Sequence, residues 1–224
     1  MSELDFLQCN FCVPNFIDSL IARKKSFNPD ALGVSGLICF CGVQGSGKTL
    51  SSVLYLKKLM DFYPKAICVS NISLNPNFFD ISRIIPYTGI NQLHSIQNGE
   101  NGVIILLDEI QIEFNSLESK QMNIPVFELV CQQRKQRKHI IGTTQVFGRL
   151  AKPFREQFKL AVLCQNLLGS MFLQRVYSAE NVADEEDIRT ELVPKSTKFY
   201  FASPDFFNLY DTYQVVTRVG KEFS

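Results

Sequence analysis

Near the start of the chain, an apolar run is followed by a glycine-rich stretch and then by a helical pattern. Residues 35–40, "SGLICF", predict a buried strand, and residues 40–50 read "FCGVQGSGKTL". In residues 49–63 the apolar side chains recur mostly three and four positions apart, as on one buried face of a helix, and Pro64 ends the pattern. The glycines therefore connect a strand to a helix.

Three further apolar runs predict short strands: "AICVSNI" (66–72), "VIILL" (103–107) and "HIIGTTQ" (139–145). The run 103–107 is typical of a strand buried on both faces of a parallel sheet. Residues 124–138 have a helical pattern that becomes basic toward its end, whereas residues 81–101 show no clear pattern. Strands that alternate with helices predict a doubly wound α/β sheet.

The longest apolar stretch in the second half, residues 160–173, does not predict a membrane span. It has 14 residues with Gln165 and Asn166 near its middle, whereas about 18 to 20 apolar residues are needed to cross a bilayer. A hairpin with "NLLG" as its turn is the better interpretation. The N-terminus lacks the features of a cleavable signal, so we expect a soluble, cytoplasmic protein.

The length of 224 residues suits one core with small additions. We expect an N-terminal extension over residues 1–30, a core over residues 31–180 and a C-terminal appendage that packs on the core over residues 181–224. The formal net charge is only +1, so any basic surface must be local. Seven cysteines, most of them inside apolar runs, indicate reduced thiols.

The glycine-rich stretch carries the first candidate chemistry. It fits G-x-x-x-x-G-K-[ST], the phosphate-binding loop, whose backbone N–H groups surround an anion at a helix N-terminus. Lys48 is expected to reach the β- and γ-phosphates of ATP, and the Thr49 hydroxyl to ligate Mg²⁺. The expected nucleotide-binding residues are Gly42, Val43, Gln44, Gly45, Ser46, Gly47, Lys48, Thr49 and Leu50.

Two other predicted strands also end in polar residues. Asp108 and Glu109 follow "VIILL", and Gln145 ends "HIIGTTQ". Because ligands bind outside the carboxyl ends of parallel strands, we expect these side chains to meet the glycine-rich loop in one crevice. There we expect Asp108 to hold Mg²⁺ through a water and Glu109 to polarise the water that attacks the γ-phosphate. Gln145 is expected to touch the γ-phosphate or that water and to report hydrolysis.

With these residues in place, the chain resembles the P-loop ATPases of the FtsK/HerA group. Within that group it is similar to the zonula-occludens-toxin-like proteins of phages and mobile elements. The resemblance is carried by "GVQGSGKT", "VIILLDEIQIEFNS" and "QRKQRKHIIGTTQ", with a weaker match at "LYDTYQVV" (209–216). It implies a three-layer P-loop NTPase of the RecA/FtsK-HerA type with a mostly parallel central sheet.

The resemblance also implies an arginine that acts on a neighbouring subunit. In those families this arginine lies eleven residues before the strand-ending glutamine, which points to Arg134, and the segment after the glutamine makes Arg155 a second candidate. The toxin-like proteins usually carry a membrane span after the ATPase domain. Since none is predicted here, a soluble motor such as a genome-packaging ATPase is favoured.

The bases around Arg134 have two interpretations. Lys135, Arg137 and Lys138 could contact DNA phosphates, or they could form the solvated face of a helix. Spacing does not separate these alternatives. Near the N-terminus, Cys9 and Cys12 have the spacing of half a zinc site, but the chain offers no second pair, so zinc is not favoured.

The leading hypothesis is an ATP-hydrolysing motor that forms a ring of identical subunits, a hexamer or a pentamer, and translocates DNA. A viral capsid or membrane assembly factor is a further expected partner, in the host cytoplasm or on the virion. Two alternatives remain open. One is a nucleotide-driven morphogenesis or secretion factor that does not bind DNA, and the other is a P-loop kinase or nucleotide switch.

Overall fold

A computed structural model describes residues 21, 28, 30–114, 136–182, 192–212 and 214. The chain divides into two compact units, Met1–Asp30 and Ala31–Ser224. All strands and all helices with stated bounds belong to the second unit.

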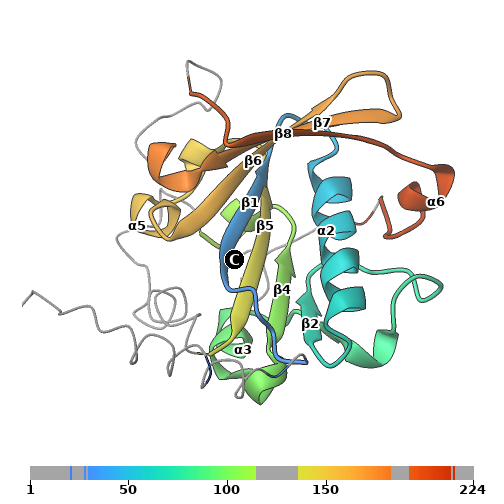
Figure 1. The fold of residues 1–224 in the computed structure, drawn as a ribbon, viewed down its shortest axis with the longest axis vertical. Coiled ribbons are helices and arrows are strands. Elements are labelled where there is room, and N and C mark those ends of the chain that lie inside the picture. Colours follow the sequence, from blue (N-terminus) through green and yellow to red (C-terminus); the bar gives the residue numbers. More distant parts are fainter. Residues whose placement is uncertain are drawn as a thin grey trace, which may run out of the picture. The chain divides into compact units, whose positions relative to one another are not determined.

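The second unit is built on one eight-stranded sheet (Figure 1). Its strands are β1 (Gly36–Cys41), β2 (Ile67–Ser70), β3 (Ile84–Pro86), β4 (Val103–Leu107), β5 (Lys138–Thr144), β6 (Phe158–Asn166), β7 (Met171–Ser178) and β8 (Ser196–Phe201). Their order is β3-β2-β4-β5-β1-β6-β7-β8. The pairs from β3 to β6 are parallel, whereas β7 and β8 continue the sheet antiparallel.

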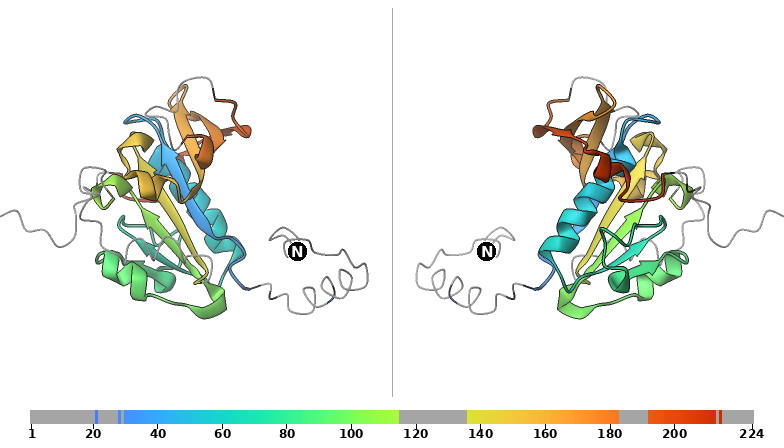
Figure 2. Two further views of the ribbon diagram at one scale, coloured as in Figure 1. Left: turned by 90° about the vertical axis from the view of Figure 1, so that its left-hand side faces the viewer. Right: turned by 90° about the vertical axis from the view of Figure 1, so that its right-hand side faces the viewer.

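Helices lie on both faces of this sheet, which gives three layers (Figures 1 and 2). α2 (Lys48–Phe62) covers one face, with α6 (Pro204–Phe207) beside it; α3 (Ile90–Ser95) and α5 (Lys152–Arg155) lie on the other. Short 3-10 helices complete the described elements: η2 (Ile81–Arg83), η3 (Gly99–Asn101), η4 (Ile110–Ile112), η6 (Phe147–Arg149) and η7 (Ala179–Asn181).

The two-residue repeat of β4 explains why this strand is apolar throughout. Ile104 and Leu106 pack with α2, whereas Val103, Ile105 and Leu107 pack in the core on the opposite face. All five side chains are completely buried. A central parallel strand covered by helices on both faces has no position for a polar side chain, so its first polar residues come where it ends.

The predicted strands and the first helix are confirmed to within one or two residues at their ends. The hairpin is confirmed too, with residues 167–170 between β6 and β7. Among the described residues, no helix is both long enough and apolar enough to cross a bilayer. The unclear region 81–101 contains β3 and α3, which are too short for a periodic pattern. Residues 196–201 add β8, whose residues are mostly exposed and form no buried apolar run.

The prediction of a helix through residue 138 is wrong at its end, because β5 begins at Lys138. The Lys138 side chain is completely buried, and its ammonium group donates hydrogen bonds to the carbonyl oxygens of Leu93 (2.7 Å) and His94 (3.1 Å). Its predicted contact with DNA is therefore wrong, because a phosphate cannot reach it. Arg137 is half-buried and donates to the Leu32 carbonyl oxygen at 3.3 Å. Residues 124–135 of the predicted helix lie outside the described residues.

His139, the next residue of β5, makes stability depend on pH. Its ring is buried beside the Tyr55 hydroxyl, 3.1 Å from Nε2. Burial, together with the positive charge of Lys159, lowers the pKa of His139 to about 4. The unfolded chain binds the proton at an ordinary pKa of about 6.5, so it takes up more protons than the folded chain between these values.

We therefore expect the free energy of unfolding to fall as the pH drops from 7 to 4.5, by about 2–3 kcal/mol from this histidine alone. Urea unfolding at several pH values measures this dependence. The same titration of His139→Gln should lack this part of the loss. An equally steep loss in the variant would contradict the assignment.

Candidate active site

The glycine-rich loop leaves the carboxyl end of β1 and leads directly into α2. The N–H of Gly42, its first residue, donates to the Thr144 carbonyl oxygen at the end of β5 (3.2 Å). Val43, Gln44 and Gly45 are exposed at the crest of the loop, whereas Ser46 and Lys48 are buried. The loop is therefore anchored at both ends and open between them.

Two of the glycines are required by the backbone. Gly45 has φ of 79° and Gly47 has φ of 83°, in the left-handed region that other residues rarely adopt. A Cβ atom on Gly47 would lie only 2.4 Å from the Phe172 ring. The chain can thus pass close to β7 and turn into α2 only with glycine at this position.

The N-terminus of α2 suits an anion. Gly47 is the N-cap and supplies no side chain to accept hydrogen bonds from the first N–H groups of the helix. The Ser46 hydroxyl, also in the loop, is buried and has no hydrogen-bond partner within the described part of the chain. Phosphate oxygens would satisfy these donors and interact favourably with the helix dipole.

Asp108, the first residue after β4, connects the loop to the neighbouring strand. Its Oδ1 accepts hydrogen bonds from the hydroxyl groups of Thr49 (2.9 Å) and Thr143 (2.6 Å). Asp108 follows β4, Thr143 belongs to the neighbouring strand β5, and Thr49 lies in the first turn of α2. The structure thus brings together the two residues predicted to hold Mg²⁺.

The backbone of Asp108 is held from the other side by Asn71, which follows β2. Asn71 accepts from the Asp108 N–H (2.8 Å) and donates to the Asp108 carbonyl oxygen (2.9 Å). Sequence reasoning did not select Asn71 or Thr143 as site residues. Both stand in polar endings of predicted strands, "SN" and "TT", and that signal could have found them.

Glu109 turns back toward the loop. Its carboxylate Oε1 lies 3.1 Å from the Lys48 ammonium nitrogen, and its other oxygen accepts from the Gln111 side chain. The residue has φ of 50°, a left-handed conformation that is costly for a side chain other than glycine. A hydrogen bond from its N–H to the Thr143 hydroxyl (2.9 Å) holds it there. Backbone strain at this position is typical of a functional site.

A cavity of about 550 Å³ is lined by Lys48, Thr49, Asp108 and Glu109, among others. This volume is within the usual range for a small-molecule site. Burial raises the pKa of Asp108, while hydrogen bonds from Thr143 and Thr49 oppose this shift. A cation beside this carboxylate would offset the cost of burying its charge. The Asp108 carboxylate and the Thr49 hydroxyl are the oxygen ligands that Mg²⁺ takes together with phosphates, so they fit that ion.

The other predicted site residues are less closely tied to this cavity. Gln145 is exposed immediately after β5, next to the residue that contacts Gly42. Arg155 ends α5 on the face opposite α2, and its Nε is buried without a hydrogen-bond partner among the described residues. Arg134, Lys135 and the pair Cys9 and Cys12 lie outside the described residues.

The arrangement can bind a phosphate chain and act on a water beside it. The loop and Lys48 supply positive potential, Asp108 and Thr49 supply ligands for a cation, and Glu109 is a carboxylate able to accept a proton. Each group is positioned by a hydrogen bond, an ion pair or a backbone constraint, as a preorganised site requires.

Solved structures with the same fold come from several proteins. The N-terminal domain of zonular occludens toxin from Neisseria meningitidis aligns with a TM-score of 0.51 at 15% identity, over 80% of this chain and 100% of that one. B204, the DNA-packaging ATPase from Sulfolobus Turreted Icosahedral Virus, aligns with 0.50 at 13% identity, over 69% and 95%. B204 from Sulfolobus turreted icosahedral virus 2 in complex with AMPPCP also gives 0.50, at 14% identity, over 78% and 98%.

These alignments show the P-loop NTPase fold that the sequence predicts. Among curated protein sequences, none matches this chain. The family model for zonular occludens toxin (Zot) matches residues 37–215, well over half of the 224 residues. The matched range contains the loop, both acidic residues and every strand except the first residue of β1. The chain therefore belongs to the zonular occludens toxin (Zot) family.

Proposed function

We propose that this protein is an ATP-hydrolysing motor subunit that works in a ring of identical subunits and translocates DNA, as in viral genome packaging. The observation that carries the proposal is the pairing of Lys48 and Thr49 with Glu109 and Asp108 across one cavity. Two segments about 60 residues apart in the chain meet there, with the residue types that hydrolysis of a triphosphate requires.

In the proposed reaction, the loop N–H groups and Lys48 hold the β- and γ-phosphates. Thr49 and Asp108 would hold Mg²⁺, and the ion would offset part of the phosphate charge. A triphosphate gives Lys48 a second anionic partner, so the Glu109 carboxylate can turn to a water. Glu109 takes a proton from that water while the water oxygen attacks the γ-phosphorus. The bond between the γ-phosphorus and the ADP oxygen breaks, and ADP leaves. Gln145, at the end of β5, contacts the γ-phosphate or the water.

The assignment of DNA as the substrate rests on the similarity in fold to B204. B204 is described as a DNA-packaging ATPase, and it shares the fold of this chain. A ring gives each site a neighbour that can supply an arginine, for which Arg134 is the first candidate and Arg155 the second. We place the protein in the cytoplasm, that of the host if it is viral, or on the virion.

Replacing Glu109 tests the chemical step. Glu109→Gln keeps the size of the side chain but removes the base, so we expect kcat for ATP hydrolysis to fall at least about 100-fold. ATP binding should change little, because the Lys48 ammonium stays in place. Phosphate release and calorimetric titration measure the two quantities.

Glu156→Gln, on an exposed carboxylate after α5, is the matched control and should retain full activity. Near-normal hydrolysis by Glu109→Gln would contradict the motor and favour a kinase or nucleotide switch.

The role of Arg134 is tested by mixing inactive variants. Arg134→Ala lacks the arginine, and Lys48→Ala lacks a working phosphate site, so each alone should lose about 10³-fold or more in hydrolysis rate. A mixture should regain activity, because a Lys48→Ala subunit supplies Arg134 to the intact site of its neighbour. A mixture as inactive as its parts would exclude Arg134 as the arginine that acts in trans. In that case Arg155→Ala is tested in the same way.

DNA binding is tested at Lys135, because the buried Lys138 cannot take part. Lys135→Ala should weaken binding of labelled duplex and single-stranded oligonucleotides and reduce the slope of log affinity against log salt by about one. Lys58→Ala, on the exposed side of α2, is the control and should change neither quantity. Absence of salt-dependent DNA binding by the unchanged protein would favour the morphogenesis factor.

A further inference from the structure

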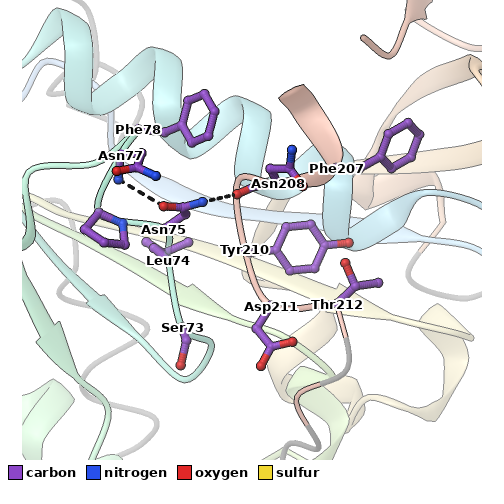
Figure 3. Close-up of a pocket in the computed structure, with 11 residues that line it drawn as sticks. Ser73, Leu74, Asn75, Asn77, Phe78, Phe207, Asn208, Tyr210, Asp211 and Thr212 are labelled. Carbon is purple, nitrogen blue, oxygen red and sulfur yellow. Dashed lines mark hydrogen bonds between the residues drawn. The ribbon is translucent and has the colours of Figure 1, made fainter. Parts of the chain in front are cut away.

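The cavity at the loop is larger than a phosphate chain needs. Its lining includes the loop, the two acidic residues and, from the C-terminal segment, Phe207, Tyr210, Asp211 and Thr212. The same four residues line a second cavity of about 730 Å³, whose opposite wall is formed by residues 73–78 (Figure 3). The C-terminal segment thus borders open space beside the loop.

Phe207 is an exposed aromatic side chain that is connected to the loop through a ring contact with Phe172. Phe172 packs against Gly47 and is buried, and its ring centroid lies 6.5 Å from that of Phe207. Phe207 itself is 44% exposed and ends α6. An aromatic ring of this kind is available for stacking by a planar group.

The segment that carries these side chains is held in place by the loop after β2. Asn75 donates from its side chain to the Asn208 carbonyl oxygen (2.7 Å; Figure 3) and from its N–H to the Leu209 carbonyl oxygen (2.9 Å). The N–H of Asp211 donates to the Ser73 carbonyl oxygen at 3.1 Å. Asn71, which positions Asp108, belongs to the same loop. One short stretch therefore positions both Asp108 and the C-terminal part of the cavity lining.

The hydroxyl groups of Tyr210 and Thr212 lie together on the cavity wall (Figure 3). Burial first, and then the negative charge of Asp108, raises the pKa of Tyr210 to about 12, so its hydroxyl stays protonated at neutral pH. The wall formed by the C-terminal segment thus presents two hydroxyl groups and one exposed aromatic ring.

We propose that Phe207, Tyr210 and Thr212 form the nucleoside subsite: the base stacks on Phe207, and the two hydroxyl groups face the ribose. The inference rests on the proposed function, since the phosphates must occupy the loop for the nucleoside to extend toward α6. It assigns nucleoside binding to the C-terminal segment, which contains neither the glycine-rich loop nor the acidic pair.

The test compares ATP with inorganic tripolyphosphate, which has the same phosphates but no nucleoside. With the full chain and Mg²⁺ present, Phe207→Ala should weaken ATP binding about tenfold, the size expected for one lost base stack. Binding of tripolyphosphate should stay within about twofold of the original, because only the loop holds it. Phe207→Tyr keeps a ring and should restore ATP affinity.

Phe199→Ala is the matched control, since this exposed aromatic on β8 lines neither cavity. It should leave both affinities unchanged. Equal weakening of ATP and tripolyphosphate by Phe207→Ala would overturn the subsite, because that pattern indicates a distorted loop. Unchanged affinity for both would overturn it as well. Lys48→Ala separates the two proposals. If this variant binds neither ATP nor tripolyphosphate, the phosphate site stands, whatever the result for Phe207→Ala. If it still binds both, the proposed function itself fails.

Discussion

The hydrogen bonds around Asp108 are the interaction on which the candidate site depends. Asn71 fixes the backbone of this residue, and Thr49 and Thr143 fix its carboxylate. These contacts join the ends of β2, β4 and β5 to the first turn of α2. Without them, a buried carboxylate would lie beside the loop with unpaired oxygens, which costs free energy and leaves its direction undefined.

The sheet order makes this junction possible. β5 lies between β1, which leads into the loop, and β4, which leads into the acidic pair. Because β5 separates β1 from β4, Thr143 of β5 can support both acidic residues. It contacts the side chain of Asp108 and the N–H of Glu109. It also leaves room for Glu109 to reach Lys48 from the neighbouring position, at the cost of a strained backbone. Preorganisation of this kind is what hydrolysis of a triphosphate needs.

The C-terminal part of the chain supplies another part of the cavity lining. It enters the sheet as β8, crosses to the side of α2 at α6, and pairs with the loop after β2 through Leu74 and Tyr210 (Figure 1). The family match ends at residue 215, so it includes this segment. At identities of 13–15%, the likeness to solved structures shows the fold but not the substrate. The experiments on DNA and on nucleosides therefore carry the functional assignment.

By itself, the sequence was enough to predict the strand, loop and helix of the phosphate site, because glycine conformation and apolar periodicity act over neighbouring residues. It also predicted that Asp108 and Glu109 would face this loop, since parallel strands end at one edge of a sheet. Only the tertiary structure showed that Asn71 and Thr143 hold the acidic pair, that Lys138 is buried, and that Phe207 reaches the same cavity. These features depend on strand register and on contacts between distant segments, and residue spacing along the chain carries no information about either.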